Sequence, residues 1–298
     1  MTRLDPLVEG YLDYKKDVNK LAHGSMKDIR CSLRRVIRLM QQVRPDTPLW
    51  KLSFEDFLRY VELEREAQAS PATINKNITH TRGLLEYAWR SGRTDRNVLK
   101  GFFLKDGEQR TPPRSLTLEE AKVLIEACPR STAEERRDRT IVLLLYGCGL
   151  RNGELCGLNV QHVSTERREL SVMKAKGDKP RIVPVPDAVY TELLAYLHDR
   201  GGKRGPLFRT WAKKKRLAIK DVGNVVRLAV KRAGLPNDIK PKTLRHSFAT
   251  HLMDRGVDLG VIASLMGHRS PQETGVYLHV LPSRMERAVS TLDPGEAS

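Results

Sequence analysis

The first hundred residues place apolar side chains at the spacing of amphipathic helices. Between residues 26 and 43, an apolar side chain recurs every three or four positions, as on a helix with one buried face. Similar patterns begin near Val8 and cover residues 54–67 and 71–88. The last of them opens with a proline, which is favoured at the first helical position. Residues 1–104 are therefore predicted to form a small helical bundle.

A polar stretch at residues 105–115 interrupts this pattern. It contains one glycine and two prolines and lacks apolar periodicity, so we predict an exposed linker. The segment after it, residues 117–120, reads Thr-Leu-Glu-Glu, the pattern of a capping box at a helix N-terminus. A second domain is therefore expected over residues 116–298.

The second domain mixes helical and alternating patterns. Residues 140–146 are strongly apolar and predict a buried helix. Residues 170–185 alternate around a glycine-containing turn, which predicts two strands joined as a hairpin. Further helices are expected over residues 187–197, 221–233, 243–255, 258–266 and 271–280, with a short amphipathic helix at about 283–292. The predicted fold class is thus mainly α with a small antiparallel β-sheet.

The charge balance narrows the possible partners. The 298 residues contain 53 Lys and Arg against 36 Asp and Glu, a net charge of +17. Both predicted domains are basic, as a protein that contacts a duplex from two sides would be. Such a surplus favours a polyanion such as nucleic acid, although charge alone leaves open a basic protein without this partner.

Several other classes of protein are disfavoured by the sequence. The four cysteines form no CxxC pair, which argues against a zinc ribbon or a dithiol motif. No segment approaches the roughly 20 apolar residues of a membrane helix, and no apolar run marks a signal peptide, so we expect a cytoplasmic protein without a membrane partner. Phosphate-loop, HExxH and GxSxG patterns are absent. Chemistry without a metal or other cofactor is therefore favoured.

Four segments carry candidate chemistry. They contain Arg151 after two glycines, Lys176 in the hairpin turn, Lys242 and Arg245 on one predicted helix, and His268 followed by Tyr277. Each has an ordinary structural interpretation when it is taken alone. A lysine in a turn is usually solvated, and a tyrosine on a helix usually packs against its neighbours.

Together and in this order, the segments resemble the tyrosine recombinase (phage integrase) family. Residues 149–155 match its pattern G-L-R-x-x-E-L, and residues 244–252 match L-R-H-x-F-A-T-H-L. A lysine in a hairpin turn and a G-H pair nine residues before the tyrosine complete the pattern. The compact length is similar to that of Xer-type members. The resemblance implies a helical core-binding (SAM-like) bundle at the N-terminus and a mixed α+β catalytic domain after the linker.

The resemblance also implies a mechanism. Tyr277 would attack a DNA phosphate and form a 3′-phosphotyrosyl bond, and Lys176 would protonate the departing 5′ hydroxyl. Two arginines would stabilise the negative charge on the equatorial oxygens of the phosphorus, and Glu154 would orient Arg151 or the helix joint. The residues assigned catalytic roles in this way are Arg151, Lys176, Lys242, Arg245, His268 and Tyr277. The family usually has histidine where this chain has Lys242, and lysine is a poor proton acceptor at neutral pH.

Partners follow from the same resemblance. It implies double-stranded DNA with paired half-sites, held by a homotetramer, or by a heterotetramer with a related recombinase, on two duplexes. The helix at residues 283–292 would dock on a neighbouring subunit. Two alternatives share part of the pattern: a type IB topoisomerase-like nicking–closing enzyme and a DNA-binding relative that has lost catalysis.

Overall fold

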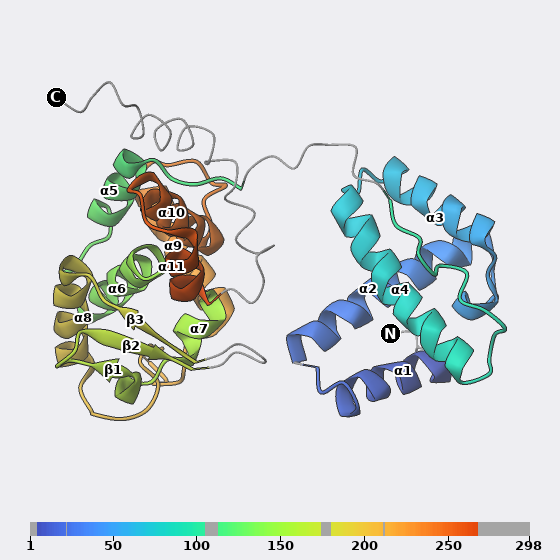
Figure 1. The fold of residues 1–298 in the computed structure, drawn as a ribbon, viewed down its shortest axis with the longest axis horizontal. Helices are drawn as coiled ribbons and strands as arrows, with labels where there is room; N and C mark the ends of the chain where they lie inside the picture. The colour runs from blue at the N-terminus through green and yellow to red at the C-terminus, as the bar shows by residue number, and fades with distance from the viewer. Residues whose placement is uncertain (1–4, 22, 105–112, 174–179, 211, 268–298) are drawn as a thin grey trace, which may run out of the picture. The chain divides into compact units, whose positions relative to one another are not determined.

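The computed structural model describes residues 5–21, 23–104, 113–173, 180–210 and 212–267 (Figure 1). The chain divides into two compact units, Met1–Arg110 and Thr111–Ser298. Within the described ranges, no helix is long and apolar enough to cross a membrane. Of the expected linker, only residues 113–115 lie in the described part.

The first unit is a helical bundle, as the apolar periodicity predicts. Its core consists mainly of side chains from the helices, among them the fully buried Leu33, Phe57, Tyr60 and Leu84. A capping box formed by Ser53 begins one of the helices. The elements are α1 (Pro6–Asp17), α2 (His23–Val43), η1 (Leu49–Lys51), α3 (Phe54–Glu66) and α4 (Pro71–Arg90).

A buried carboxylate joins three helices of this bundle. Glu64 on α3 has a fully buried side chain and accepts two hydrogen bonds from Arg35 on α2, at 2.7 and 2.6 Å. The hydroxyl of Tyr60 donates to it at 2.8 Å, and Asn77 on α4 donates at 3.4 Å. Because the carboxylate is paired and hydrogen-bonded on several sides, its burial is compensated.

The second unit packs its helices around α6. This helix contacts α8, α9 and α10, and its apolar half lies in a core that also contains side chains from the sheet (Figure 1). Phe248, Met253, Ile262 and Met266 form a smaller cluster between the last two described helices. The helices are α5 (Leu118–Glu126), α6 (Ala133–Gly147), α7 (Asn152–Gly157), η2 (Val160–His162), α8 (Asp187–Arg200), α9 (Ile219–Arg232), α10 (Pro241–Asp254) and α11 (Leu259–Met266).

The sheet of this unit has three antiparallel strands in the order β1-β2-β3 (Figure 1). The predicted hairpin is confirmed, with β2 (Glu169–Val172) paired to β3 (Arg181–Pro184) so that Leu170 faces Val183. The turn that joins them, residues 174–179, lies outside the described residues. The strand β1 (Val163–Ser164) was not predicted, because two residues are too short to show an alternation.

Helix α6 begins at Ala133, about two turns earlier than the apolar pattern indicates. Its first residues are charged, so they carry no continuous hydrophobic signal. Thr132 nevertheless caps the helix, because its side chain accepts from the backbone N–H of Glu135 and the Glu135 side chain accepts in return. The helices predicted over residues 271–280 and 283–292 lie outside the described residues.

Helix α10 binds the backbone just before α5. The hydroxyl of Ser247 accepts from the N–H of Leu116 at 2.7 Å, and the Nε2 atom of His251 lies 2.8 Å from the carbonyl oxygen of the same residue. The other ring nitrogen of His251 lies 2.8 Å from the hydroxyl of Tyr146 on α6. We call these contacts the Leu116 clasp.

Candidate active site

The turn between α6 and α7 presents Arg151 at the start of α7. Gly149 adopts φ +59°, in the left-handed region that L side chains rarely adopt. A Cβ atom at this position would lie 2.4 Å from the ring of Phe248 on α10. The glycine therefore allows both the sharp turn and the close approach of α10, which brings the next arginine of the pattern near Arg151.

Glu154 is a buried acceptor at the centre of the site. Its side chain is 1% exposed. One carboxylate oxygen accepts from the backbone N–H of Arg151 at 2.8 Å, and the other accepts from the Arg151 guanidinium at 3.0 Å. Glu154 thus both caps α7 and orients Arg151, as the sequence predicts.

Arg245 reaches the same carboxylate from α10. Its guanidinium donates to the carbonyl of Gly149 at 2.5 Å and to the carbonyl of Met266 at 2.7 Å. One of its nitrogens lies 3.6 Å from Glu154. Arg245 is 10% exposed and Arg151 is 30% exposed, so Arg151 is the more accessible of the two to a ligand.

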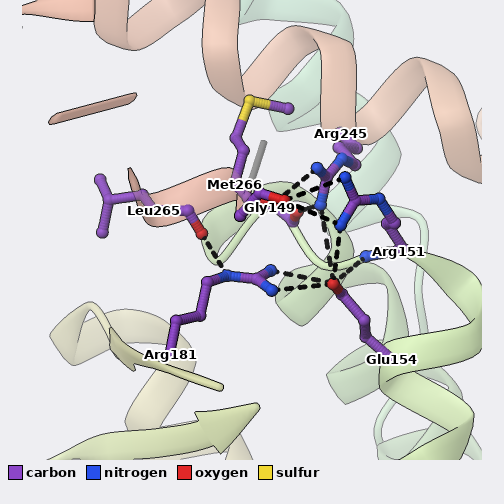
Figure 2. A network of polar contacts seen from close by, with 8 residues as sticks. Gly149, Arg151, Glu154, Arg181, Arg245, Leu265 and Met266 are labelled. Carbon is purple, nitrogen blue, oxygen red and sulfur yellow. Dashed lines mark hydrogen bonds and ion pairs between the residues drawn. The ribbon is translucent and has the colours of Figure 1, made fainter. Parts of the chain in front are cut away.

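A third arginine, Arg181 on β3, completes the cluster and was missed by the sequence analysis. It forms a two-pronged ion pair with Glu154, at 2.8 and 2.9 Å (Figure 2). A signal for it exists in the sequence. Arg181 shares the inner face of its strand with Val183 and Val185, and an arginine on a buried face needs an acidic partner.

The end of α11 accepts hydrogen bonds from all three arginines. Positive charge near the C-terminus of a helix is favoured because the last carbonyl groups have no partner within the helix. Three successive carbonyls each bind a different guanidinium, and Figure 2 shows those of Leu265 and Met266. The pairs are Arg181 Nε with Leu265 at 2.7 Å, Arg245 Nη2 with Met266 at 2.7 Å, and Arg151 Nη2 with Gly267 at 3.2 Å.

The electrostatics of this cluster favour an anionic ligand. Burial alone would raise the pKa of Glu154, but hydrogen bonds from Arg181 and from the backbone of Arg151, with the nearby arginine charges, lower that pKa overall. Glu154 is therefore ionised at neutral pH. Three guanidinium groups and one carboxylate leave two positive charges on the described cluster. Guanidinium groups held in this way suit the oxygens of a phosphate.

The remaining predicted site residues are not gathered in the cluster. Lys242 lies on the first turn of α10 and is exposed, and among the residues that the structure describes it makes no hydrogen bond or ion pair. Lys176, His268 and Tyr277 lie outside the described residues. No group of three His, Cys, Asp or Glu suited to a metal ion occurs in the described part of the chain.

Comparison with known proteins identifies the family. Residues 114–284, more than half of the chain, match the model of the Phage integrase family. The chain belongs to this family. Proteins similar to this chain are named tyrosine recombinases. The chain is a tyrosine recombinase of the Xer type.

Two relatives and one solved structure illustrate the match. The recombinase is 40% identical to tyrosine recombinase XerA of Pyrococcus furiosus over 182 residues, which are 60% of this chain and 62% of that protein. It thus spans less than two thirds of this relative. XerA of Thermococcus kodakarensis is 32% identical over 269 residues, 78% of this chain and 93% of that protein.

The solved structure shows the fold of the recombinase. The Tn1549 transposon integrase, in complex with transposon right-end DNA, has a TM-score of 0.75 at 20% identity. The match covers 95% of this chain and 99% of that chain. The fold of the recombinase is therefore that of an integrase, with a mainly helical chain and a small antiparallel sheet.

Proposed function

We propose that this tyrosine recombinase cuts and rejoins DNA strands at specific sites through a covalent bond between Tyr277 and a DNA 3′-phosphate. The observation that carries the proposal is the cluster of Arg151, Arg181 and Arg245 around Glu154. It lies at the end of α11, directly before the segment that contains His268 and Tyr277 in the sequence. A cytoplasmic location is proposed with it, because the substrate is cellular DNA.

The arginine cluster supports the first step of the reaction. When the Tyr277 oxygen attacks phosphorus, negative charge grows on the non-bridging oxygens. Fixed cations stabilise that charge without reorganising. Arg151 and Arg245 are assigned this role, because both lie at the cluster and the planar fork of a guanidinium can bind two phosphate oxygens. Lys242 is assigned a hydrogen bond to the same phosphate.

Proton transfers complete the proposed cycle. The bond between phosphorus and the 5′ oxygen breaks as the bond to Tyr277 forms, and Lys176 donates a proton to the leaving oxygen. His268 is assigned to assist the loss of the tyrosine proton. A 5′ hydroxyl of another strand then attacks the phosphotyrosine and releases Tyr277. The number of phosphodiester bonds is conserved, so no external energy source is needed.

Duplex DNA and an assembly of four subunits belong to the same proposal. The net charge of +17 supports a polyanionic partner. Exchange between two duplexes needs one cut in each of the four strands, and four subunits can supply one cut each. The segment at residues 283–292 is proposed to dock on a neighbouring subunit. This assembly separates the recombinase from a nicking–closing enzyme, which would act without a second duplex.

A nicked suicide substrate tests the proposal. Cleavage near the nick releases a short fragment that carries the 5′ hydroxyl. Because this fragment diffuses away, the strand cannot be rejoined and the protein stays attached to the DNA. Wild-type protein is expected to form a slowly migrating covalent adduct on a denaturing gel, and Tyr277→Phe is expected to form none. Tyr190→Phe is the matched control, because that hydroxyl donates to the carbonyl of Thr165 in the sheet region.

Two outcomes would contradict the proposal. An adduct formed equally by Tyr277→Phe would mean that another residue is the nucleophile. Absence of an adduct with the wild-type protein, despite measurable DNA binding, would favour the inactive DNA-binding alternative. Strand exchange between two labelled duplexes then separates a recombinase from a nicking–closing enzyme.

A further inference from the structure

Arg181 is one of the two deeply buried cations of the cluster. Its side chain is 9% exposed, against 10% for Arg245 and 30% for Arg151. Both terminal nitrogens bind Glu154, and Nε binds the carbonyl of Leu265 at 2.7 Å. A Cβ atom on Gly267 would lie 2.7 Å from one of these terminal nitrogens. The guanidinium is therefore fixed on one side by α7 and on the other by the end of α11.

This geometry makes Arg181 a poor candidate for direct contact with DNA. A ligand that replaced Glu154 as its partner would leave a buried carboxylate with fewer donors, which is strongly unfavourable. The contacts point to a different task. With Arg181 bound, the charge of Glu154 is largely compensated from the strand side. Without Arg181, that carboxylate would attract Arg151 and Arg245 more strongly, and the described cluster would lose one of its two net positive charges.

We propose that Arg181 is a positioning residue for strand cleavage. It pairs with Glu154 and holds the end of α11, so that Arg151 and Arg245 keep the geometry in which they bind the reacting phosphate. This inference rests on the proposed function and adds to it a residue outside the six assigned by the family resemblance. Its effect is exerted on the attack step, where charge develops on the phosphate.

A competing route runs through the hairpin. Arg181 follows Lys176 by five residues, so it could act by positioning the lysine that protonates the leaving oxygen. Within the described part of the chain, the guanidinium of Arg181 contacts Glu154 and the end of α11, and these contacts support the first route. The two routes differ chemically. Loss of the acid affects departure of the 5′ oxygen, whereas loss of the phosphate clamp affects any leaving group.

The experiment uses two versions of the suicide substrate with the full-length protein. One has the normal 5′ bridging oxygen at the cleavage site. The other has a 5′ bridging sulfur, which leaves as a thiolate and does not need a proton. Single-turnover rates of adduct formation are measured for Arg181→Met, Arg181→Lys and Lys176→Ala. Arg130→Met is the matched control, because its side chain is 70% exposed and pairs with Glu192.

The expected result separates the two routes. Arg181→Met is expected to cleave the oxygen substrate more slowly by on the order of 100-fold, the loss associated with misplacing a reacting group. Its defect persists with the sulfur substrate, whereas sulfur restores Lys176→Ala. Arg181→Lys keeps the charge without the two-pronged geometry and is expected to lie between Arg181→Met and wild type. Arg130→Met cleaves at the wild-type rate.

A double variant tests the role of Glu154. If Arg181 acts by compensating this carboxylate, Arg181→Met combined with Glu154→Gln is expected to cleave no more slowly than Arg181→Met alone. Multiplied defects would mean that the two residues act independently and would overturn the inference. Circular dichroism and thermal unfolding establish that each variant is folded. If Arg181→Met fails to fold, Arg181→Lys decides, and wild-type cleavage by Arg181→Lys overturns the inference.

Other outcomes also bear on the inference alone. Rescue of Arg181→Met by the sulfur substrate would assign Arg181 to the acid route, and unimpaired cleavage of the oxygen substrate would assign it no role. Either result overturns the inference while wild-type adduct formation leaves the proposed function intact. A wild-type protein that forms no adduct overturns the proposed function, and the inference falls with it.

Discussion

At the scale of single residues, Lys242 differs from the arginines of the site. It precedes Arg245 by one turn on α10, yet Lys242 is exposed whereas Arg245 is buried against carbonyl groups. The ammonium group of lysine is a strongly hydrated charge on a flexible side chain, so it does not need fixed hydrogen-bond partners in the protein. Its exposure leaves it accessible to a ligand that arrives from solvent, as a DNA phosphate would.

We predict that Lys242→Ala loses cleavage and keeps DNA binding. Removal of one donor to a developing oxyanion lowers the rate by about 10²–10³-fold. One surface charge among many contributes little to the affinity for DNA. Adduct formation on the suicide substrate measures the first effect, and a gel shift measures the second. Lys240→Ala is the control, because Lys240 is also exposed and lies two residues away. Near-wild-type cleavage by Lys242→Ala would exclude this lysine from the phosphate site.

Sequence reasoning found some of these residues and not others, for a physical reason. Arg151 and Glu154 are three positions apart at the start of one helix, so their contact is local and was expected. Arg181 reaches Glu154 from 27 residues away, through the pairing of β3 with the rest of the sheet. Local periodicity carries no information about which buried cation meets which buried anion.

At the scale of elements, the end of α11 organises the site. The helix ends at Gly267, which has φ +63° and serves as its left-handed C-cap. The last carbonyls are thus turned towards the arginines, and the guanidinium of Arg181 lies against the glycine. Gly267 thus both ends the helix and lies against the Arg181 guanidinium, so few other residues can replace it.

We predict that Gly267→Ala lowers both stability and cleavage. The left-handed backbone disfavours alanine by roughly 1–2 kcal/mol, and the added Cβ displaces the Arg181 guanidinium. Gly234→Ala is a matched control, because Gly234 has φ +66° after α9 and a Cβ there meets nothing within 4 Å. Both variants are expected to unfold at lower urea concentration. Only Gly267→Ala is expected to cleave more slowly, and equal cleavage by the two variants would contradict this view of α11.

The buried Glu64 gives the first unit a pH-dependent stability. Burial would raise the pKa of this carboxyl, but hydrogen bonds from Arg35 and Tyr60 lower it overall. Because the folded-state pKa lies below the ordinary value, this stabilisation is present at neutral pH. It is lost as the pH falls through the folded-state pKa. The link between α2, α3 and α4 therefore weakens in acid.

We predict that Arg35→Met is destabilising by about 1–3 kcal/mol at pH 7, because it leaves Glu64 buried with fewer donors. In this variant desolvation dominates, so the pKa of Glu64 rises and the group can be protonated at mildly acidic pH. The deficit relative to wild type is expected to shrink as the pH falls from 7 towards 4. Urea unfolding at several pH values measures it. Arg30→Met, which breaks a pair with two partly exposed side chains, is expected to change stability by less than about 1 kcal/mol. A constant deficit at all pH values would contradict the role of Glu64.

At the scale of the whole molecule, the fold class was accessible from the sequence, because helices with one apolar face leave a periodic record. The arrangement of segments 149–155, 181, 242–252 and 265–267 around one carboxylate was not. That arrangement depends on how α6, α10 and the sheet pack, and the family resemblance pointed to Arg151 and Arg245 but not to Arg181.

The Leu116 clasp couples the segment before α5 to the helix that carries Arg245. Two hydrogen bonds attach the backbone of Leu116 to side chains of α10. Ser247 and His251, which make those bonds, are two and six residues from Arg245 along the same helix. A displacement of the backbone at Leu116 would therefore act directly on the helix that carries Arg245, so the clasp makes the position of α10 sensitive to the segment that precedes α5.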